Sequence, residues 1–212
     1  EMVDKVLLGH GAVGNDHPIG PANQYFAADL PQLEYDPDMA KKLLADAGVS
    51  DVTVQLSASD AAFAGAGDAA QLYQASAKAA GINIEVVQEP ADGYWSNVWL
   101  KKPWCACYWS GRATEDWMFS TAYETGVPWN DTSWENARFQ ELLLSGRAEL
   151  DTAKRKEIYT EMQAIMSAEG GTIVPMYANY VDAHSSKLAN SGTIGNLWQM
   201  DSSRIAERWW MA

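Results

Sequence analysis

Basic residues are scarce in this sequence, and it contains no long apolar run. Its 212 residues include 15 Lys and Arg against 28 Asp and Glu, which gives a formal net charge of −13. Nucleic acids and anionic membrane surfaces attract basic patches, so this charge argues against both as partners. No apolar run approaches the ~20 residues that a membrane helix needs. A hydrophobic content of 47% is typical of a globular protein, and 212 residues suit one large or two small domains.

Cysteine and histidine are also rare, which limits metal and catalytic chemistry. Cys105 and Cys107 are one residue apart on a predicted strand, so both point to one face, and a disulfide across so short a loop would be strained. We expect two buried thiols. His10, His17 and His184 are scattered, with no HExxH spacing, and we expect the first two to be solvated loop residues. No GxSxG nucleophile motif occurs. The sequence therefore predicts no metal, no cofactor and no enzyme.

The first half of the chain alternates strand and helix patterns. Asp36 caps a predicted helix that Gly48 ends, and its apolar stripe is expected to be buried. This stripe of the helix consists of Ala40, Leu43, Leu44 and Ala47. Strands with alternating apolar residues follow at 52–56 and 82–86. Between the strands, a helix over 68–80 carries a candidate capping box, Asp68 with Gln71, and Gly81 ends it. A short helix over 92–102 and a strand over 104–109 complete a β-α-β-α-β order. This order predicts an α/β fold, an open mixed sheet with helices on both faces.

The second half of the chain is mainly helical. Apolar residues at helical spacing predict one helix through about Arg147 and another from Asp151 to Gly170. A strand is expected over 172–177, at a sheet edge or a crossover because Pro175 cannot donate to a neighbour. The remainder is weakly patterned, and Trp209 and Trp210 are expected to be exposed.

The junction after the strand at 104–109 is the candidate site. A strand that ends in a polar turn and opens a helix is where α/β proteins place ligands. Thr114 is the expected helix N-cap, and ten Trp in the whole chain leave both core packing and ligand stacking open. We expect Trp117 to lie in the core. The candidate ligand-binding residues are Tyr108, Trp109, Ser110, Gly111, Arg112, Glu115 and Asp116.

Arg112 has two interpretations from sequence alone. Its planar guanidinium suits a carboxylate or a phosphate. Alternatively, Arg112 forms an internal salt bridge to Glu115 or Asp116, three and four residues further on. Glu115 and Asp116 do not form an acid–base pair in this prediction, because adjacent helical residues diverge by about 100°.

Three segments resemble one protein family. Residues 35–48, Tyr-Asp-Pro-Asp-Met-Ala-Lys-Lys-Leu-Leu-Ala-Asp-Ala-Gly, resemble the DPxxAKxLLxxAG segment of periplasmic solute-binding proteins of peptide and nickel ABC importers, extracellular solute-binding protein family 5. Residues 80–86 resemble that family's helix-to-strand junction, and residues 155–177 its later helix and strand.

The resemblance implies a two-lobed binding protein of roughly twice this length. This sequence would correspond to the C-terminal lobe, as a fragment with half of the ligand site. It implies a segment crossing from the missing N-terminal lobe over 1–20, a ligand-binding lobe over 21–175, and a tail returning toward the first lobe over 176–212. The implied partners are a small solute or peptide, the absent N-terminal lobe and an ABC permease in the inner membrane, and the implied compartment is the periplasm.

The resemblance also makes Arg112 informative about the charge of the ligand. Many peptide binders of the family read Gly-Trp-x-x-Asp at the strand end, where the Asp pairs with the peptide ammonium. Trp109 matches the Trp, whereas Arg112 stands where the Asp would be, and it would repel an ammonium. We therefore expect a small anionic or zwitterionic solute anchored by Arg112 and stacked on Trp109. The alternatives are a peptide whose amine the other lobe holds, a carbohydrate- or oligopeptide-binding member, and a hydrolase lobe.

Overall fold

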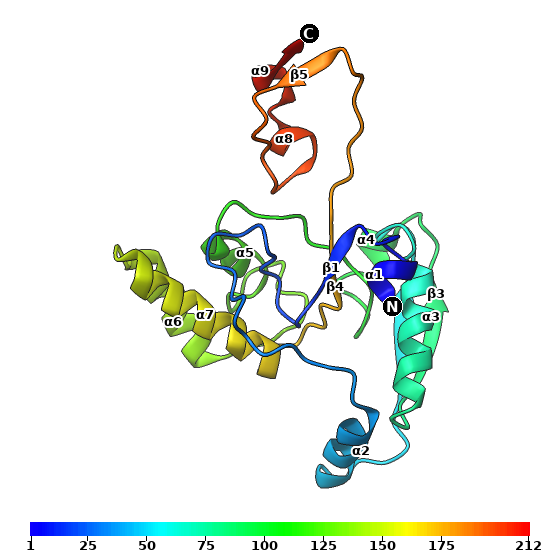
Figure 1. Ribbon diagram of the computed structural model, residues 1–212. Helices are drawn as coiled ribbons and strands as arrows, with labels where there is room; N and C mark the ends of the chain where they lie inside the picture. The colour runs from blue at the N-terminus through cyan, green and yellow to red at the C-terminus, as the bar shows by residue number, and fades with distance from the viewer. The chain divides into compact units, whose positions relative to one another are not determined.

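The computed structural model describes residues 1–212, which form two compact units (Figure 1). The first unit contains Glu1–Leu8 and Gln32–Tyr108, and the second contains Gly9–Pro31 and Trp109–Ala212. The first unit has α1 (Met2–Lys5), α2 (Pro37–Asp46), β2 (Thr53–Ala58), α3 (Ala66–Lys78), β3 (Asn83–Gln88) and α4 (Tyr94–Asn97). The second unit has β1 (Gly11–Val13), α5 (Glu115–Ala122), α6 (Ala137–Ala148), α7 (Thr152–Glu169), β4 (Met176–Ala178), β5 (Leu188–Asn190), α8 (Gln199–Ser203), α9 (Ile205–Arg208) and β6 (Trp209–Met211).

A β-α-β element forms the centre of the first unit, as predicted. β2 and β3 pair in parallel, with Thr53 opposite Asn83 and Ala58 opposite Gln88. α3 connects the two strands and packs on them, and Leu56, Ala58, Ala70 and Ile84 are buried between them. Gly81 ends the helical segment with φ of +82°, a conformation that glycine adopts without strain.

The third predicted strand, over 104–109, is reduced to one bridge. Ser57 of β2 donates its N–H to Trp104 O at 3.1 Å and accepts from Ala106 N at 2.8 Å, which pairs Cys105 in parallel with β2. Beyond Tyr108 the chain leaves the first unit, so no further ladder forms. Cys105 and Cys107 form no disulfide and are half-buried, so the expectation of full burial is wrong.

Two details of the predicted helices in the first unit are also wrong. α3 begins at Ala66, and Gly65 precedes it with φ of +83°, so Asp68 lies inside the first turn and forms no capping box. α2 has the predicted cap, because Asp36 Oδ1 accepts from Asp38 N and Met39 N. However, α2 buries no residue, and Leu43 is 61% exposed. Helical periodicity identifies the apolar face of α2, but burial also requires another element to cover that face.

The core of the second unit lies between α5, α6 and α7, the helices that the sequence predicts there. Phe119, Phe139 and Met162 are fully buried in it. Gln163 of α7 connects this core to the segment before α2, because its Nε2 donates to Tyr25 O and its Oε1 accepts from Ala27 N, both at 2.9 Å. The early segment 23–27 is therefore part of the second unit.

The remaining strands of the second unit form two small sheets. β1 pairs antiparallel with β4, and β5 pairs antiparallel with β6. The expected strand over 172–177 is thus shortened, while Pro175 O accepts from Gly14 N at 2.9 Å. α8 contains left-handed residues, Met200, Asp201 and Ser202, with φ of 52–59°. The α/β class is confirmed, but the strands form three two-stranded sheets instead of one open sheet.

His17 is buried, which corrects the expectation of a solvated loop residue. Its side chain is 1% exposed, beside Phe26 and Tyr177. The hydroxyl of Tyr177 donates to His17 O at 2.7 Å and lies 3.2 Å from His17 Nδ1. Burial disfavours the charged imidazolium and lowers the pKa of His17 to about 4. None of the helices is both long enough and apolar enough for a membrane span.

Candidate functional site

The predicted site lies at the start of α5 and in the turn before it. Thr114 is the N-cap, as predicted, because its Oγ1 accepts from Trp117 N at 3.1 Å. Glu115 and Asp116 occupy the first helical turn, where the helix dipole favours negative charge. Ser110, Gly111 and Arg112 form the irregular connection that leads into this cap, which we call the turn.

Arg112 is held by its own turn and by two aromatic rings. Its Nη1 donates to Ser110 O at 2.8 Å and to Ser110 Oγ at 2.9 Å. Its Cζ lies 5.8 Å from the ring centroid of Trp109 and 5.5 Å from that of Trp117, within cation–π range. The guanidinium forms no ion pair, so the alternative of a salt bridge to Glu115 or Asp116 is wrong.

Glu115 and Asp116 contact separate partners within the protein. Glu115 is 2% exposed, and its Oε1 accepts from Tyr25 N at 2.8 Å. Asp116 Oδ1 accepts from Arg147 Nε at 3.0 Å, in a partly exposed ion pair. Both carboxylates are therefore engaged within the protein, and they do not converge on a common point as an acid and a base would.

The rings around Arg112 form a cluster of four tryptophans. Trp109 lies 6.0 Å from Trp129, and Trp117 lies 6.3 Å from Trp198 in an edge-to-face arrangement with an interplanar angle of 87°. Trp117 is 47% exposed, so its predicted place in the core is wrong. We call Arg112 with these four rings the Arg112–tryptophan cluster. It places apolar stacking surface and a positive charge at one location.

Sequence reasoning missed Trp129 and Trp198 as members of this cluster. Trp129 follows α5 in an irregular loop, and Trp198 precedes α8 in a weakly patterned segment. No local motif marks either residue. The high tryptophan content was the only general signal for them.

Backbone contacts fix the turn from two sides. Trp198 Nε1 donates to Gly111 O at 2.6 Å, and Asn23 Nδ2 donates to Arg112 O at 3.2 Å. Leu197 O lies so close to Gly111 that a Cβ on this glycine would be only 2.8 Å away from it. Only glycine fits at position 111 without a shift of the neighbouring chain.

Tyr108 stands apart from the other predicted site residues. It is the last residue of the first unit, whereas Trp109 begins the second. Its ring is exposed and lies 5.6 Å from Trp95 in an edge-to-face arrangement with an interplanar angle of 78°. The structure therefore brings Trp109, Ser110, Gly111, Arg112, Glu115 and Asp116 together within one unit and leaves Tyr108 in the other.

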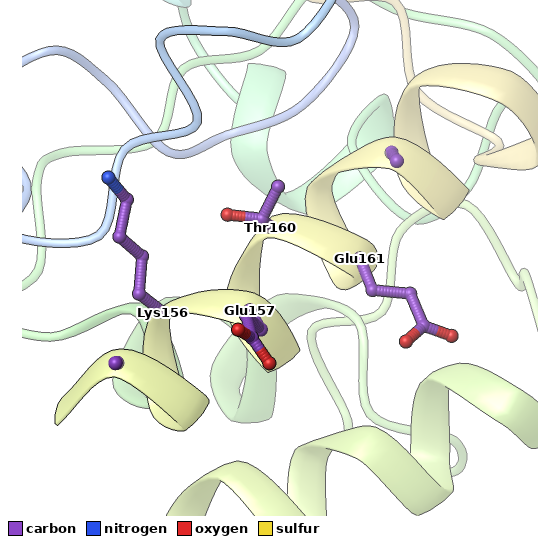
Figure 2. A pocket seen from close by; sticks show the side chains of 6 residues that line it. Lys156, Glu157, Thr160 and Glu161 are labelled. Atoms are coloured by element: carbon purple, nitrogen blue, oxygen red, sulfur yellow. The ribbon is translucent and has the colours of Figure 1, made fainter. Parts of the chain in front are cut away.

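A surface hollow on α7 does not coincide with these residues. It is lined by Ala153, Lys156, Glu157, Thr160, Glu161 and Ala164, all from one helix. Figure 2 shows Lys156 and Glu161 extending away from each other, and Glu161 is paired with Arg138. Such a face offers no converging polar groups. The structure also contains no group of three His, Cys, Asp or Glu side chains that could hold a metal ion.

Comparison with known proteins identifies the family. Residues 1–131 match the family described as bacterial extracellular solute-binding proteins, family 5 Middle. The chain belongs to this family. The resemblance seen in the sequence is thereby confirmed for more than half of the chain. No curated protein matches the sequence.

Several solved structures resemble this fold. The periplasmic binding protein DppA from Helicobacter pylori, in complex with the peptide STSA, matches with a TM-score of 0.79 and 18% identity, over 99% of this chain and 41% of that one. NikZ from Campylobacter jejuni, in complex with Ni(L-His), matches with a TM-score of 0.73 and 18% identity, over 84% and 38%. The dipeptide-binding protein from Pseudoalteromonas sp. SM9913, in complex with Met-Leu, matches with a TM-score of 0.72 and 19% identity, over 89% and 39%.

These similarities define the fold of this family member. The chain spans about two fifths of the length of the solved proteins described above. At identities below one fifth, the likeness concerns the periplasmic-binding-protein fold and not the ligand.

Proposed function

We propose that this chain provides part of the solute-binding component of an ABC importer, and that Arg112 binds the carboxylate of a small solute. The observation that carries the proposal is the set of contacts that the Arg112 guanidinium makes. Arg112 is held near Trp109 and Trp117, with Nη1 bound to Ser110 and with no acidic partner.

The unused donors of Arg112 suit a carboxylate. Its Nε and Nη2 donate to no protein atom, and together they form one edge of the planar guanidinium. Two parallel N–H groups at fixed spacing match the two oxygens of a carboxylate in a bidentate pair. The neighbouring rings restrict the guanidinium and provide surface on which an apolar part of the solute can stack.

The solute class follows from this charge. A small anionic or zwitterionic organic compound would place its carboxylate at Arg112 and its body against Trp109. Trp117 is a second candidate for stacking, since it is half exposed and its ring lies against the same guanidinium. Ser110 and Gly111 act in this proposal by shaping the turn, whereas roles for Tyr108, Glu115 and Asp116 in ligand contact remain predictions.

Peptide binding is the main alternative, and the complexes of similar proteins favour it. The Helicobacter pylori protein was solved with the peptide STSA, and the Pseudoalteromonas protein was solved with Met-Leu. A peptide could bind this chain with its terminal carboxylate at Arg112, because the positive charge excludes its ammonium from the same place. Its amine would then be held by residues outside this site.

The remaining functional assignments rest on the family. A family of extracellular solute-binding proteins supports a periplasmic location, delivery to an inner-membrane permease and a non-catalytic role. The diverging side chains of Glu115 and Asp116 also favour binding over hydrolysis. The segments 1–20, 21–175 and 176–212 remain our proposal for a crossing segment, a ligand-binding lobe and a returning tail.

A comparison of a carboxylate with its amide tests the proposal. The probes are N-acetyl-Ala-Ala-Ala and the same peptide with a C-terminal amide, titrated into the ¹⁵N-labelled chain while two-dimensional NMR spectra are recorded. We expect weak, saturable binding, with a dissociation constant on the order of 1 mM or about −4 kcal/mol, because one charged anchor carries most of it. The Arg112 Nε–H and the Trp109 and Trp117 indole signals should move with the carboxylate and stay unchanged with the amide. Equal shifts with both probes, or none with either, would overturn the assignment of Arg112.

A further inference from the structure

Trp198 connects the C-terminal segment to the proposed carboxylate anchor. Its indole Nε1 donates to Gly111 O at 2.6 Å, which belongs to the peptide group directly before Arg112. The same ring lies edge-to-face on Trp117, whose own ring centroid is 5.5 Å from the Arg112 guanidinium. One side chain therefore contacts both the backbone and the ring that determine where Arg112 lies.

The approach of this segment to the turn is unusually close. A Cβ on Gly111 would lie 2.8 Å from Leu197 O and 3.9 Å from Trp198 Nε1. The lack of a side chain at position 111 thus allows the backbone at Leu197 to cover the turn, and this brings the indole N–H within hydrogen-bonding distance. The glycine and the tryptophan act as a pair.

The segment that carries Trp198 is itself fixed by internal contacts. Asp201 is buried, and its carboxylate accepts from Gly195 N, from Arg208 Nη1 at 2.9 Å and from Trp209 Nε1 at 3.1 Å. These bonds close the chain on both sides of Trp198. The indole therefore reaches Gly111 from a constrained loop and not from a flexible end, so its hydrogen bond restricts the turn at little further entropic cost.

From these contacts we infer that Trp198 is a positioning residue, which holds the turn at Gly111 and so orients the free edge of Arg112 toward a carboxylate. The inference rests on the proposed function of Arg112. Arg112 O is held separately by Asn23, and Nη1 of Arg112 is bound to Ser110. Gly111 O accepts from Trp198 Nε1 at 2.6 Å and more distantly from Arg112 Nη1 at 3.4 Å, so Trp198 supplies the shorter contact and links this oxygen to the C-terminal segment.

Two substitutions separate the hydrogen bond from the rest of the ring. Trp198→Phe removes the N–H donor and keeps an aromatic ring against Trp117, whereas Trp198→Ala removes both contacts. Trp210→Phe is the matched control, because Trp210 lies in the same C-terminal segment, is 52% exposed and belongs to β6. We expect Trp198→Phe to weaken binding of N-acetyl-Ala-Ala-Ala by roughly threefold to tenfold, the range of one neutral hydrogen bond. Trp198→Ala should weaken it further, and Trp210→Phe should leave it unchanged.

A double-mutant cycle tests whether Trp198 acts through Arg112. In an Arg112→Met background, Trp198→Phe should change the dissociation constant of the same probe by less than about twofold, since the group that it positions is gone. A purely structural role would lower the melting temperature and weaken the probe equally in both backgrounds. That result would overturn the inference.

The outcomes also separate this inference from the proposed function. If Arg112→Met binds the probe as tightly as the parent chain, the carboxylate assignment fails and the positioning role fails with it. If Arg112→Met binds the probe more weakly while Trp198→Phe keeps full affinity, only the role of Trp198 is overturned. As a direct check, the Trp198 indole N–H should exchange with solvent far more slowly than that of exposed Trp210. Equal exchange rates would contradict the hydrogen bond itself.

Discussion

The guanidinium of Arg112 lies 5.5 Å from the ring centroid of Trp117, five residues further along the chain, and no carboxylate pairs with it. The acidic residues between them are engaged elsewhere, Glu115 with Tyr25 and Asp116 with Arg147. A cation placed on aromatic rings without an acidic partner retains its capacity to bind an anion. This relationship is the physical basis of the proposed solute site.

Glu115 is expected to stabilise the fold. Glu115→Ala would leave the N–H of Tyr25 unpaired in the buried interior, so it should lower the free energy of unfolding by about 1–3 kcal/mol. Glu115→Gln retains an acceptor oxygen and should cost clearly less. Urea denaturation of the two variants measures the difference. Equal stability of Glu115→Ala and the parent chain would show that the carboxylate is not a structural acceptor.

Gly111 is expected to tolerate no side chain. Gly111→Ala would force Leu197 O away from the turn, so we expect a loss of about 1–3 kcal/mol in stability and faster solvent exchange of the Trp198 indole N–H. Gly20→Ala is the control, because its added Cβ would lie 3.6 Å from Tyr177, an ordinary contact. Thermal unfolding and NMR exchange rates report the two effects. If Gly111→Ala matches Gly20→Ala in both, the close approach of Leu197 is incorrect.

The burial of His17 predicts a loss of stability in mild acid. Its folded-state pKa of about 4 lies below the ordinary value of 6.5, so the unfolded chain binds a proton more readily than the folded chain between these values. The contribution of His17 is therefore complete above about pH 6.5 and is lost as the pH falls toward 4, by up to about 3 kcal/mol.

A His17→Gln variant isolates this effect from neighbouring groups. Burial raises the pKa of the nearby Asp16 carboxyl, which changes stability in the opposite direction as the pH falls. The difference between the parent chain and His17→Gln, measured by urea denaturation from pH 7.5 to 4, removes that contribution. Parallel pH profiles for the two proteins would contradict the burial of a neutral His17.

The ion pair between Asp116 and Arg147 is expected to contribute little. Both side chains are partly exposed, so Asp116→Asn should lower the free energy of unfolding by less than about 1 kcal/mol. Binding of N-acetyl-Ala-Ala-Ala by the same variant tests the predicted ligand contact of Asp116. A marked loss of probe binding would support that contact, and parent affinity would leave the Asp116 carboxylate as a partner of Arg147 alone.

Local signals in the sequence predicted the parts of the fold that depend on local chemistry. The caps at Asp36 and Thr114 were correct, because a side-chain oxygen that accepts from the N–H two or three residues later needs no distant partner. The parallel pairing of β2 with β3 was likewise predictable, since a strand–helix–strand order at this spacing strongly favours it. The extent of the sheet was overestimated, and the predicted capping box of Asp68 with Gln71 does not form.

Several features that sequence reasoning missed depend on partners far away along the chain. Glu115 is bound to Tyr25, 90 residues earlier, and Gly111 to Trp198, 87 residues later. The burial of His17 and the exposure of Trp117 are decided by such distant packing, which composition and periodicity do not encode. Arg112 itself was identified because its residue type and position differ from the family's pattern.

The affinity of Arg112→Met for N-acetyl-Ala-Ala-Ala, compared with that of the parent chain, tests the central claim most directly. Removing the guanidinium while keeping an unbranched apolar side chain should weaken binding by roughly tenfold, to a level that NMR titration still measures, and Arg112→Lys should recover only part of it, because an ammonium lacks the planar fork. The stability of all three proteins should agree to within about 1 kcal/mol, since Arg112 makes no ion pair. Parent-level affinity in Arg112→Met would contradict the account and leave Arg112 as a structural residue.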